Sequence, residues 1–250
     1  MSSVLNVLVR KDLNMRKGKM AAQSAHAGGK LFLEILKRSE DKLFLSKAAE
    51  TQFLKFLNTD KNKVKIQMTL NEDSLNSELD KSKPFSIIVD NGRTEFHGVA
   101  TTTCAAYGVF EEIDLTELYV PQTYGTEIVA KQIFIFSKEN PLPKEIACEL
   151  AVESCLKILF SLMDETSVDG EIVKYFDLSK KNALNDWIKG AFGKIAVSTK
   201  NDLELDKIEQ ELRENNFKFE KLEINNNKCI AIAPQYPSDI DPFTRHLSLI

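Results

Sequence analysis

The chain is poor in the residues that mark disulfide-stabilised, metal-binding and membrane proteins. Its 250 residues contain three histidines and four cysteines. The cysteines, which lack metal-ligand spacing, are Cys104, Cys148, Cys155 and Cys229. We therefore predict a reducing compartment, no disulfide and no metal site. No apolar run approaches the length of a membrane span, and residues 1–9 lack the pattern of a signal peptide. These absences predict a cytoplasmic protein without membrane contact.

The overall composition is that of a globular protein with a proper core. Hydrophobic residues make up 43% of the chain and charged residues 28%. A length of 250 residues fits one large domain or two of ordinary size. No nucleotide-binding glycine pattern or serine nucleophile motif is present, so we expect no cofactor. The net charge is −4, but residues 5–40 hold eight Lys and Arg against three acids. Such a local basic patch can bind a polyanion on an acidic protein.

The first informative segment is VRKDLNMRKGKMAAQSAHA at residues 9–27. A strand-like run breaks into a basic loop, and a helix expected from residue 18 carries Lys19, Gln23 and His26 at spacings of four and three. These spacings place the three side chains on one helical face. A cation, an amide and an imidazole near a helix N-terminus favour an anion. The same pattern also fits a solvated Lys19 and Gln23 with a half-buried His26.

The second informative segment is a loop, DNGRTEFHG at residues 90–98, between two strand-like runs. Asp and Asn beside Gly are a turn signal, but the loop is longer than a minimal hairpin needs. Loops held on a rigid scaffold are where binding groups tend to lie. The segment is therefore better suited to presenting side chains than to turning the chain.

Together, RKDLNMRKGKMAAQSAHA and DNGRTEFHGVATTTCAA resemble the two signature blocks of the second-class peptidyl-tRNA hydrolases. This family is of archaeal and eukaryotic type and has bacterial and phage members. The resemblance covers roughly residues 4–118. It implies hydrolysis of the ester that joins a peptide to the terminal ribose of tRNA, with peptidyl-tRNA as substrate. The residue types can support that reaction without a metal, because an ester needs an aimed water, a base and a donor for the oxyanion.

The resemblance also implies which residues form the site. The family's helix, loop and last-strand residues map onto Lys19, Gln23, His26, Asp90 and Thr102. A shift of one residue would exchange this threonine for one of its two neighbours, which are also threonines. We expect Asp90 and Lys19 to be the functional pair, in which Asp90 orients water or holds Lys19, and Lys19 stabilises the oxyanion or contacts phosphate. His26 is either an acid–base group or an RNA contact.

Five basic residues flank these motifs and are candidates for phosphate contacts. Such contacts position tRNA without reading its sequence. They are Arg10, Lys11, Arg16, Lys17 and Arg93. Each of them taken singly also fits an ordinary solvated surface charge.

The second half of the chain repeats the element order of the first. When the two halves are aligned, residues 134–136 correspond to residues 7–9, and residues 229–231 correspond to residues 104–106. We therefore predict an α/β protein with two tandem copies of a small domain, each a four-stranded mixed β-sheet flanked by α-helices. The expected domains are residues 1–123, with the site motifs, and residues 124–250, a degenerate second copy.

The second copy differs where the chemistry would lie. Glu145, Glu149 and Val152 stand at the positions of the lysine, glutamine and histidine of the first helix. Residues 131–165 carry four Lys and six acids, which would repel phosphate. We expect this copy to be non-catalytic and to act as an internal partner in a pseudo-dimer. The alternative is that the whole chain is an inactive tRNA-binding or scaffold protein with the same fold.

Overall fold

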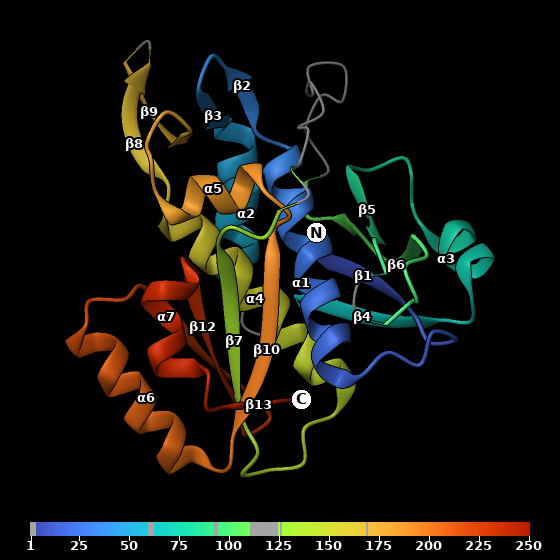
Figure 1. Cartoon of the computed structure of the whole chain (residues 1–250). Helices are drawn as coiled ribbons and strands as arrows, with labels where there is room; N and C mark the ends of the chain where they lie inside the picture. The colour runs from blue at the N-terminus through green and yellow to red at the C-terminus, as the bar shows by residue number, and fades with distance from the viewer. Residues whose placement is uncertain (1–3, 60–62, 93–94, 111–124, 126, 169) are drawn as a thin grey trace. The chain divides into compact units, whose positions relative to one another are not determined.

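The computed structural model describes residues 4–59, 63–92, 95–110, 125, 127–168 and 170–250. These residues form an α/β fold with three β-sheets (Figure 1). They divide into two compact units. The first unit contains the described residues of the first half except 16–22, together with residues 163–177. The second unit contains residues 16–22 and the rest of the second half. Each half of the sequence therefore contributes one segment to the other half's unit.

The first unit is built on a four-stranded mixed sheet of order β4-β1-β6-β5. Its strands are β1 (Leu5–Arg10), β4 (Val64–Thr69), β5 (Phe85–Asp90) and β6 (Thr101–Gly108). β1 is parallel to β4, and β6 is antiparallel to both β1 and β5. The helices of the first half are α1 (Lys17–Glu34), α2 (Lys47–Leu57) and α3 (Glu72–Glu78). Leu75 and Leu79 of the α3 region pack on Leu8 and Ala105 of the sheet.

The second unit repeats this sheet. Its order is β11-β12-β7-β10-β13, and the pairings of β10, β7, β12 and β11 have the same senses as those of β4, β1, β6 and β5. The strands are β7 (Lys131–Ser137), β10 (Gly193–Thr199), β11 (Phe219–Ile224), β12 (Asn227–Gln235) and β13 (Ser248–Leu249). The helices are α4 (Lys144–Ser161), α5 (Ala183–Lys189), α6 (Asp202–Glu214) and α7 (Pro237–Thr244). The predicted α/β fold with two equivalent mixed sheets is confirmed, and the second sheet has β13 as a fifth strand in addition to the four predicted.

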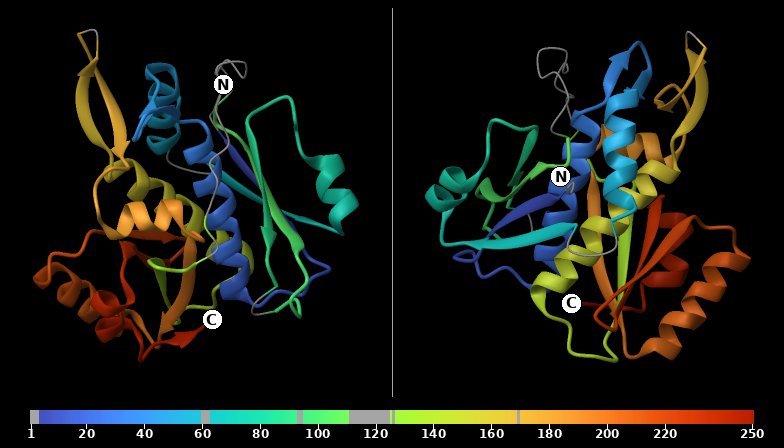
Figure 2. Two further views of the ribbon diagram at one scale, coloured as in Figure 1. Left: turned by 45° about the horizontal axis from the view of Figure 1, so that its top comes forward. Right: turned by 180° about the vertical axis from the view of Figure 1, so that it is seen from behind.

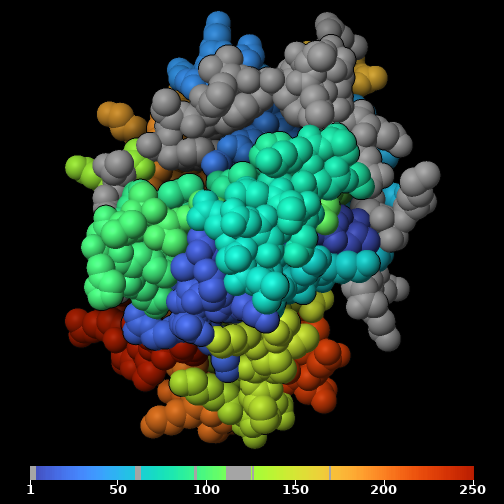
Figure 3. All heavy atoms as spheres, turned by 90° about the vertical axis from the view of Figure 1, so that its right-hand side faces the viewer, coloured from blue at the N-terminus to red at the C-terminus, as the bar shows by residue number. Residues whose placement is uncertain are grey.

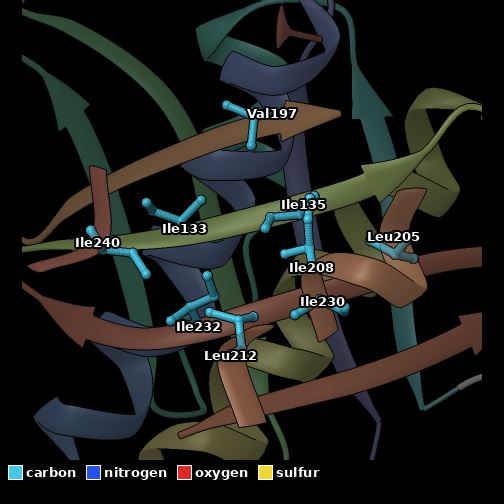
Figure 4. Packing of buried hydrophobic residues seen from close by; sticks show 9 residues of the cluster. All are labelled: Ile133, Ile135, Val197, Leu205, Ile208, Leu212, Ile230, Ile232 and Ile240. Atoms are coloured by element: carbon cyan, nitrogen blue, oxygen red, sulfur yellow. The ribbon is translucent and has the colours of Figure 1, made fainter. Parts of the chain in front are cut away.

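The core of the second unit shows why its sequence keeps the fold. Leu205, Ile208 and Leu212 recur along α6 at helical spacing and are buried. They pack on isoleucines that alternate along β7 and β12 (Figure 4). The cluster comprises Ile133, Ile135, Val197, Leu205, Ile208, Leu212, Ile230, Ile232 and Ile240. Apolar residues at helical spacing on α6 thus face apolar residues at strand spacing on β7 and β12, and the helix packs on the sheet as a second layer. The α3 region packs on β1 and β6 in the same way.

A third sheet was not predicted from the sequence. It consists of two hairpins, and its strands are β2 (Lys37–Ser39), β3 (Lys42–Leu45), β8 (Asp164–Val168) and β9 (Glu171–Asp177). The order is β2-β3-β9-β8, and Leu43 of β3 lies opposite Phe176 of β9. Figure 2 shows the two hairpins side by side. Each half of the chain therefore supplies one hairpin, inserted between its first and second helices, and both belong to the first unit.

Two matched helix starts reflect the duplication at the level of single residues. Asn71 precedes α3 and Asn201 precedes α6, both in extended conformation. The Asn71 side chain accepts a hydrogen bond from the backbone N–H of Ser74, and the Asn201 side chain accepts one from Glu204. Such caps satisfy N–H groups that have no partner within the helix. Among the described residues, no helix is long and apolar enough to cross a membrane.

Candidate active site

Four of the predicted residues lie at the carboxyl edge of the first sheet, namely Arg10, Gln23, Asp90 and Thr102. β5 and β1 are each antiparallel to β6, so the carboxyl ends of β1, β4 and β5 meet the start of β6. Asp90 ends β5, Arg10 ends β1, and a run of three threonines begins β6. Figure 3 shows this face, where the segment after β1 (blue) lies between α3 (teal) and the ends of β5 and β6 (green).

The centre of the site is a chain of hydrogen bonds through Gln23. Its Nε2 donates to Asp90 Oδ2 over 2.6 Å, and the hydroxyl of Thr103 lies 3.1 Å from Gln23 Oε1. The backbone N–H of Gly92 donates to Asp90 Oδ1 over 2.8 Å. Because a carboxylate only accepts, the Gln23 amide must turn its nitrogen to Asp90 and its oxygen to Thr103. Gln23 is 4% exposed, so this orientation is held in a largely water-free setting.

Helix α1 is fastened to the sheet along the face that carries Gln23. The thiol of Cys104 donates to the Gln23 carbonyl, and the hydroxyl of Ser86 donates to the Ala27 carbonyl over 2.7 Å. One turn further on, Lys30 Nζ donates to the carbonyl of Ile87. Gln23, Ala27 and Lys30 are four and three residues apart and so share one face. The position of Gln23 above the end of β5 therefore follows from helix–sheet packing.

Thr103 reaches Gln23 because β6 has a β-bulge at this residue. Ile88 pairs with Cys104 and Val89 with Thr102, so Thr103 is the extra residue between them. A bulge re-aims a side chain and is common next to active sites. The Thr103 hydroxyl also lies 3.3 Å from the Ile88 carbonyl. The family resemblance implies Thr102 as the site threonine, or one of its neighbours after a shift of one residue, and the structure places Thr103 beside Gln23.

Thr102 has different partners. Its hydroxyl donates to Glu72 Oε1 over 2.9 Å, and its carbonyl accepts from Arg10 Nη1 over 3.0 Å. The Arg10 guanidinium also binds Glu72 at 2.8 Å and both carboxylate oxygens of Asp12. These bonds hold the pKa of the Asp12 carboxyl below its usual value, with the hydrogen bond from Arg10 as the largest cause. Arg10, predicted to contact phosphate, is thus already held by two carboxylates.

The other predicted residues occupy several environments. Lys19 and His26 are half-buried on α1, one turn before and one turn after Gln23. Lys11 and Arg16 are exposed, whereas Lys17 Nζ donates to the Leu142 carbonyl. Arg93 lies outside the described residues. No group of three or more His, Cys, Asp or Glu side chains that could hold a metal occurs among the residues that the structure describes.

The equivalent edge of the second sheet lacks this arrangement. Lys228 precedes Cys229 as Thr103 precedes Cys104, and its Nζ binds Asp202. That pairing lowers the pKa of the Asp202 carboxyl. β11 and β12 pair without a shift, with Leu222 opposite Cys229 and Glu223 opposite Lys228. The second copy therefore has neither the bulge nor a hydroxyl in the place of Thr103.

Comparison with known proteins agrees with the duplication. The family model of peptidyl-tRNA hydrolase PTH2 matches this chain twice, over residues 3–118 and 132–250. The chain is 38% identical over 106 residues to the peptidyl-tRNA hydrolase of Metallosphaera sedula, covering 41% of this chain and 82% of that protein. It is 39% identical over 106 residues to the peptidyl-tRNA hydrolase of Sulfolobus acidocaldarius, with the same coverage. The chain belongs to the peptidyl-tRNA hydrolase PTH2 family, as a tandem duplication.

Proposed function

We propose that the first half of this chain hydrolyses the ester of peptidyl-tRNA and releases peptide and free tRNA. The observation that carries the proposal is the Thr103–Gln23–Asp90 chain at the carboxyl edge of the first sheet. Membership in the family supports the same reaction. The site supplies a fixed carboxylate, an oriented amide and a hydroxyl within one hydrogen-bond network. Such groups are suited to orienting a water molecule for attack on the carbonyl carbon of an ester.

Asp90 is the centre of the proposed mechanism. Gly92 and Gln23 each donate to one of its oxygens, and a carboxylate held in this way can orient a water molecule toward the ester carbonyl. Lys19 lies on α1 one turn before Gln23 and is the proposed cation for the oxyanion or the terminal phosphate. Thr103 takes the role that the sequence analysis gave to Thr102. His26, one turn after Gln23, is an acid–base group or an RNA contact.

Binding of tRNA is assigned to basic side chains of the two segments that carry the site motifs. Lys11 and Arg16 are exposed and follow β1, so they are the leading candidates for phosphate contacts. Lys17 and Arg93 complete the proposed set. Arg10 is left out, because its guanidinium already binds Asp12 and Glu72. Phosphate contacts of this kind position the substrate and make its affinity depend on salt.

The reaction is proposed to need no metal or other cofactor, because the polar groups described can orient water and stabilise an oxyanion by themselves. The test is incubation of the purified full chain with a model peptidyl-tRNA, with and without EDTA. Release of free tRNA at the same rate in both reactions supports the proposal. Activity that EDTA abolishes contradicts metal independence, and tRNA binding without hydrolysis of several peptidyl-tRNAs supports the inactive-scaffold alternative.

The second half, residues 124–250, is proposed as a non-catalytic internal partner. It has Glu145, Glu149 and Val152 at the site positions, while the pairing of β3 with β9 joins a hairpin from each half of the chain in one sheet. We expect the full chain to be monomeric, with its pseudo-dimer contact inside one polypeptide. Light scattering tests this expectation, and a stable dimer of full chains contradicts it. Cytoplasmic location is proposed because the four cysteines are buried thiols that form no disulfide, as in a reducing compartment.

A further inference from the structure

The β-bulge at Thr103 is held from its other side by a charged cluster that the proposed reaction does not use. We call Arg10, Asp12 and Glu72 the brace. Arg10 Nη1 donates to the Thr102 carbonyl over 3.0 Å, and Glu72 Oε1 accepts from the Thr102 hydroxyl over 2.9 Å. Arg10 and Glu72 are bonded to each other at 2.8 Å, so these two residues and Thr102 form a closed ring of hydrogen bonds.

The brace is itself anchored. Asp12 accepts from Arg10 Nε over 3.2 Å and from Nη2 over 2.7 Å, which is a bidentate pair. Bidentate arginine–carboxylate pairs fix both direction and distance, unlike a single point charge. The Arg10 side chain is 11% exposed, whereas those of Asp12 and Glu72 are 36% and 49% exposed, so only the arginine of the brace is shielded from solvent. Its geometry therefore constrains the backbone at Thr102, directly before the bulge.

The second copy provides an internal comparison. Ser137 follows Phe136 as Arg10 follows Val9, so the guanidinium is absent there. Asp202 directly follows the helix cap Asn201, as Glu72 directly follows the helix cap Asn71. Asp202 binds the Lys228 side chain, whereas Glu72 accepts from the hydroxyl of Thr102, the residue before the bulge. β11 and β12 then pair in regular register. The brace and the bulge thus occur together in the first copy, which has Gln23 and Asp90. Both are absent from the second copy, which has no equivalents of these two residues.

We infer that Arg10 and Glu72 are positioning residues that hold the β6 bulge and so aim the Thr103 hydroxyl at Gln23. The inference rests on the proposed function. A displacement of about 1 Å in a catalytic group can cost about 10²-fold in rate. The brace acts through Thr103 and Gln23 on the reacting groups, so its loss should lower kcat and leave KM and tRNA affinity nearly unchanged.

The test compares Glu72→Ala with Asp73→Asn in the full chain. Asp73 is the neighbouring exposed acid in the first turn of α3, so its variant controls for the change in charge near the helix N-terminus. We expect Glu72→Ala to lower kcat about 10-fold to 100-fold, and Asp73→Asn to stay near wild type. Glu72→Ala should cost much less in a Thr103→Val background. On this inference both changes lower kcat through loss of the bond between the Thr103 hydroxyl and Gln23, which can be lost only once.

Three outcomes overturn the inference. The first is wild-type kcat in Glu72→Ala, and the second is a full additional loss in the Thr103→Val background. The third is a salt-dependent change in KM alone, which would make Arg10 and Glu72 part of the tRNA-binding surface. Thermal unfolding of each variant identifies any loss of kcat that is due to global unfolding.

A measurement without substrate separates this inference from the proposed function. Amide hydrogen exchange of residues 101–104 should be faster in Glu72→Ala than in Asp73→Asn, because the brace holds this backbone. Inactivity of the wild-type chain on peptidyl-tRNA would refute the proposed function. The exchange measurement would then still test whether Arg10 and Glu72 hold the backbone of residues 101–104. Equal exchange in the two variants would refute the brace, even if the wild-type chain were active.

Discussion

The Gln23 side chain donates from Nε2 to Asp90 Oδ2 over 2.6 Å, and this bond connects helix α1 to the end of β5. The other oxygen of Asp90 is held by the N–H of Gly92. Both carboxylate oxygens thus have a fixed direction before any substrate binds. Preorganised groups of this kind need no rearrangement in the transition state, which is how a site lowers a barrier.

Replacing Asp90 should abolish turnover without abolishing binding. Loss of a positioned acid–base group costs about 10²–10⁴ in rate, and removal of a negative charge should not weaken the hold on phosphate. We expect Asp90→Asn to lower kcat by that factor while tRNA affinity stays the same or rises slightly. Near-full turnover in Asp90→Asn would show that the centre of the site lies elsewhere or that the second copy is active.

Lys11→Ala should have the opposite effect. Lys11 is exposed beside the site, so its loss should weaken tRNA binding and reduce the steepness of the salt dependence by about one phosphate contact. Titration of tRNA binding at several salt concentrations measures this change. Unchanged affinity and an unchanged salt slope would remove Lys11 from the binding surface.

Thr103 should matter more than the neighbouring threonine. Thr103→Val removes the hydroxyl beside Gln23 and leaves the shape of the side chain nearly intact. We expect a loss in kcat of about 10-fold to 10²-fold, recovered in Thr103→Ser. Thr102→Val should cost less, because Arg10 stays bonded both to the Thr102 carbonyl and to Glu72. Measurement of kcat for the three variants decides the assignment, and a larger loss in Thr102→Val would reverse it.

Gly92 and Gly98 provide a matched pair in the loop after β5. Both have positive φ, +74° and +79°, so either alanine variant is strained. A Cβ on Gly92 would lie 2.6 Å from the Val99 nitrogen, whereas a Cβ on Gly98 would have no atom of the described residues within 4 Å apart from its chain neighbours. We therefore expect Gly98→Ala to cost about 1 kcal/mol in the free energy of unfolding with activity retained. Gly92→Ala should also displace the N–H that holds Asp90 and lower kcat. Equal activity of the two variants would contradict this role.

Lys194 should make the stability of the second unit depend on pH. Its Nζ is buried without a hydrogen-bond partner among the described residues and lies 3.7 Å from the centre of the Phe192 ring and 4.2 Å from that of Trp187. Burial lowers the pKa of Lys194 from 10.5 to about 7. Above pH 7 the unfolded chain therefore binds more protons at this residue than the folded one, and its contribution to stability increases with pH.

Trp187 is the single tryptophan and stacks on Phe192, so its fluorescence reports on this region during denaturation. We expect Lys194→Met to be more stable than the wild-type chain at pH 7, by a margin that shrinks towards pH 9. Burial raises the pKa of the nearby Cys155 thiol above its usual value, which favours the neutral thiol in the folded chain. The exposed Lys200 provides the control variant Lys200→Met. A constant margin between pH 7 and pH 9 would contradict the assignment.

The sequence by itself determined those features that depend on local spacing. The four- and three-residue intervals after Lys19 placed Gln23 and His26 on one face of α1, and Asp90 followed from a loop bounded by strand-like runs. The apolar periods of strands and helices in both halves were sufficient to predict the two equivalent sheets.

Only the tertiary structure decided which threonine faces Gln23 and what Arg10 binds. A single extra residue in β6 changes which side chain reaches the site, and that register depends on pairing with β5. The Arg10–Glu72 pair joins residues 62 positions apart, and the β3–β9 pairing joins the two halves of the chain. Such contacts depend on the packing of elements that are distant in sequence, so no local pattern at either partner specifies them.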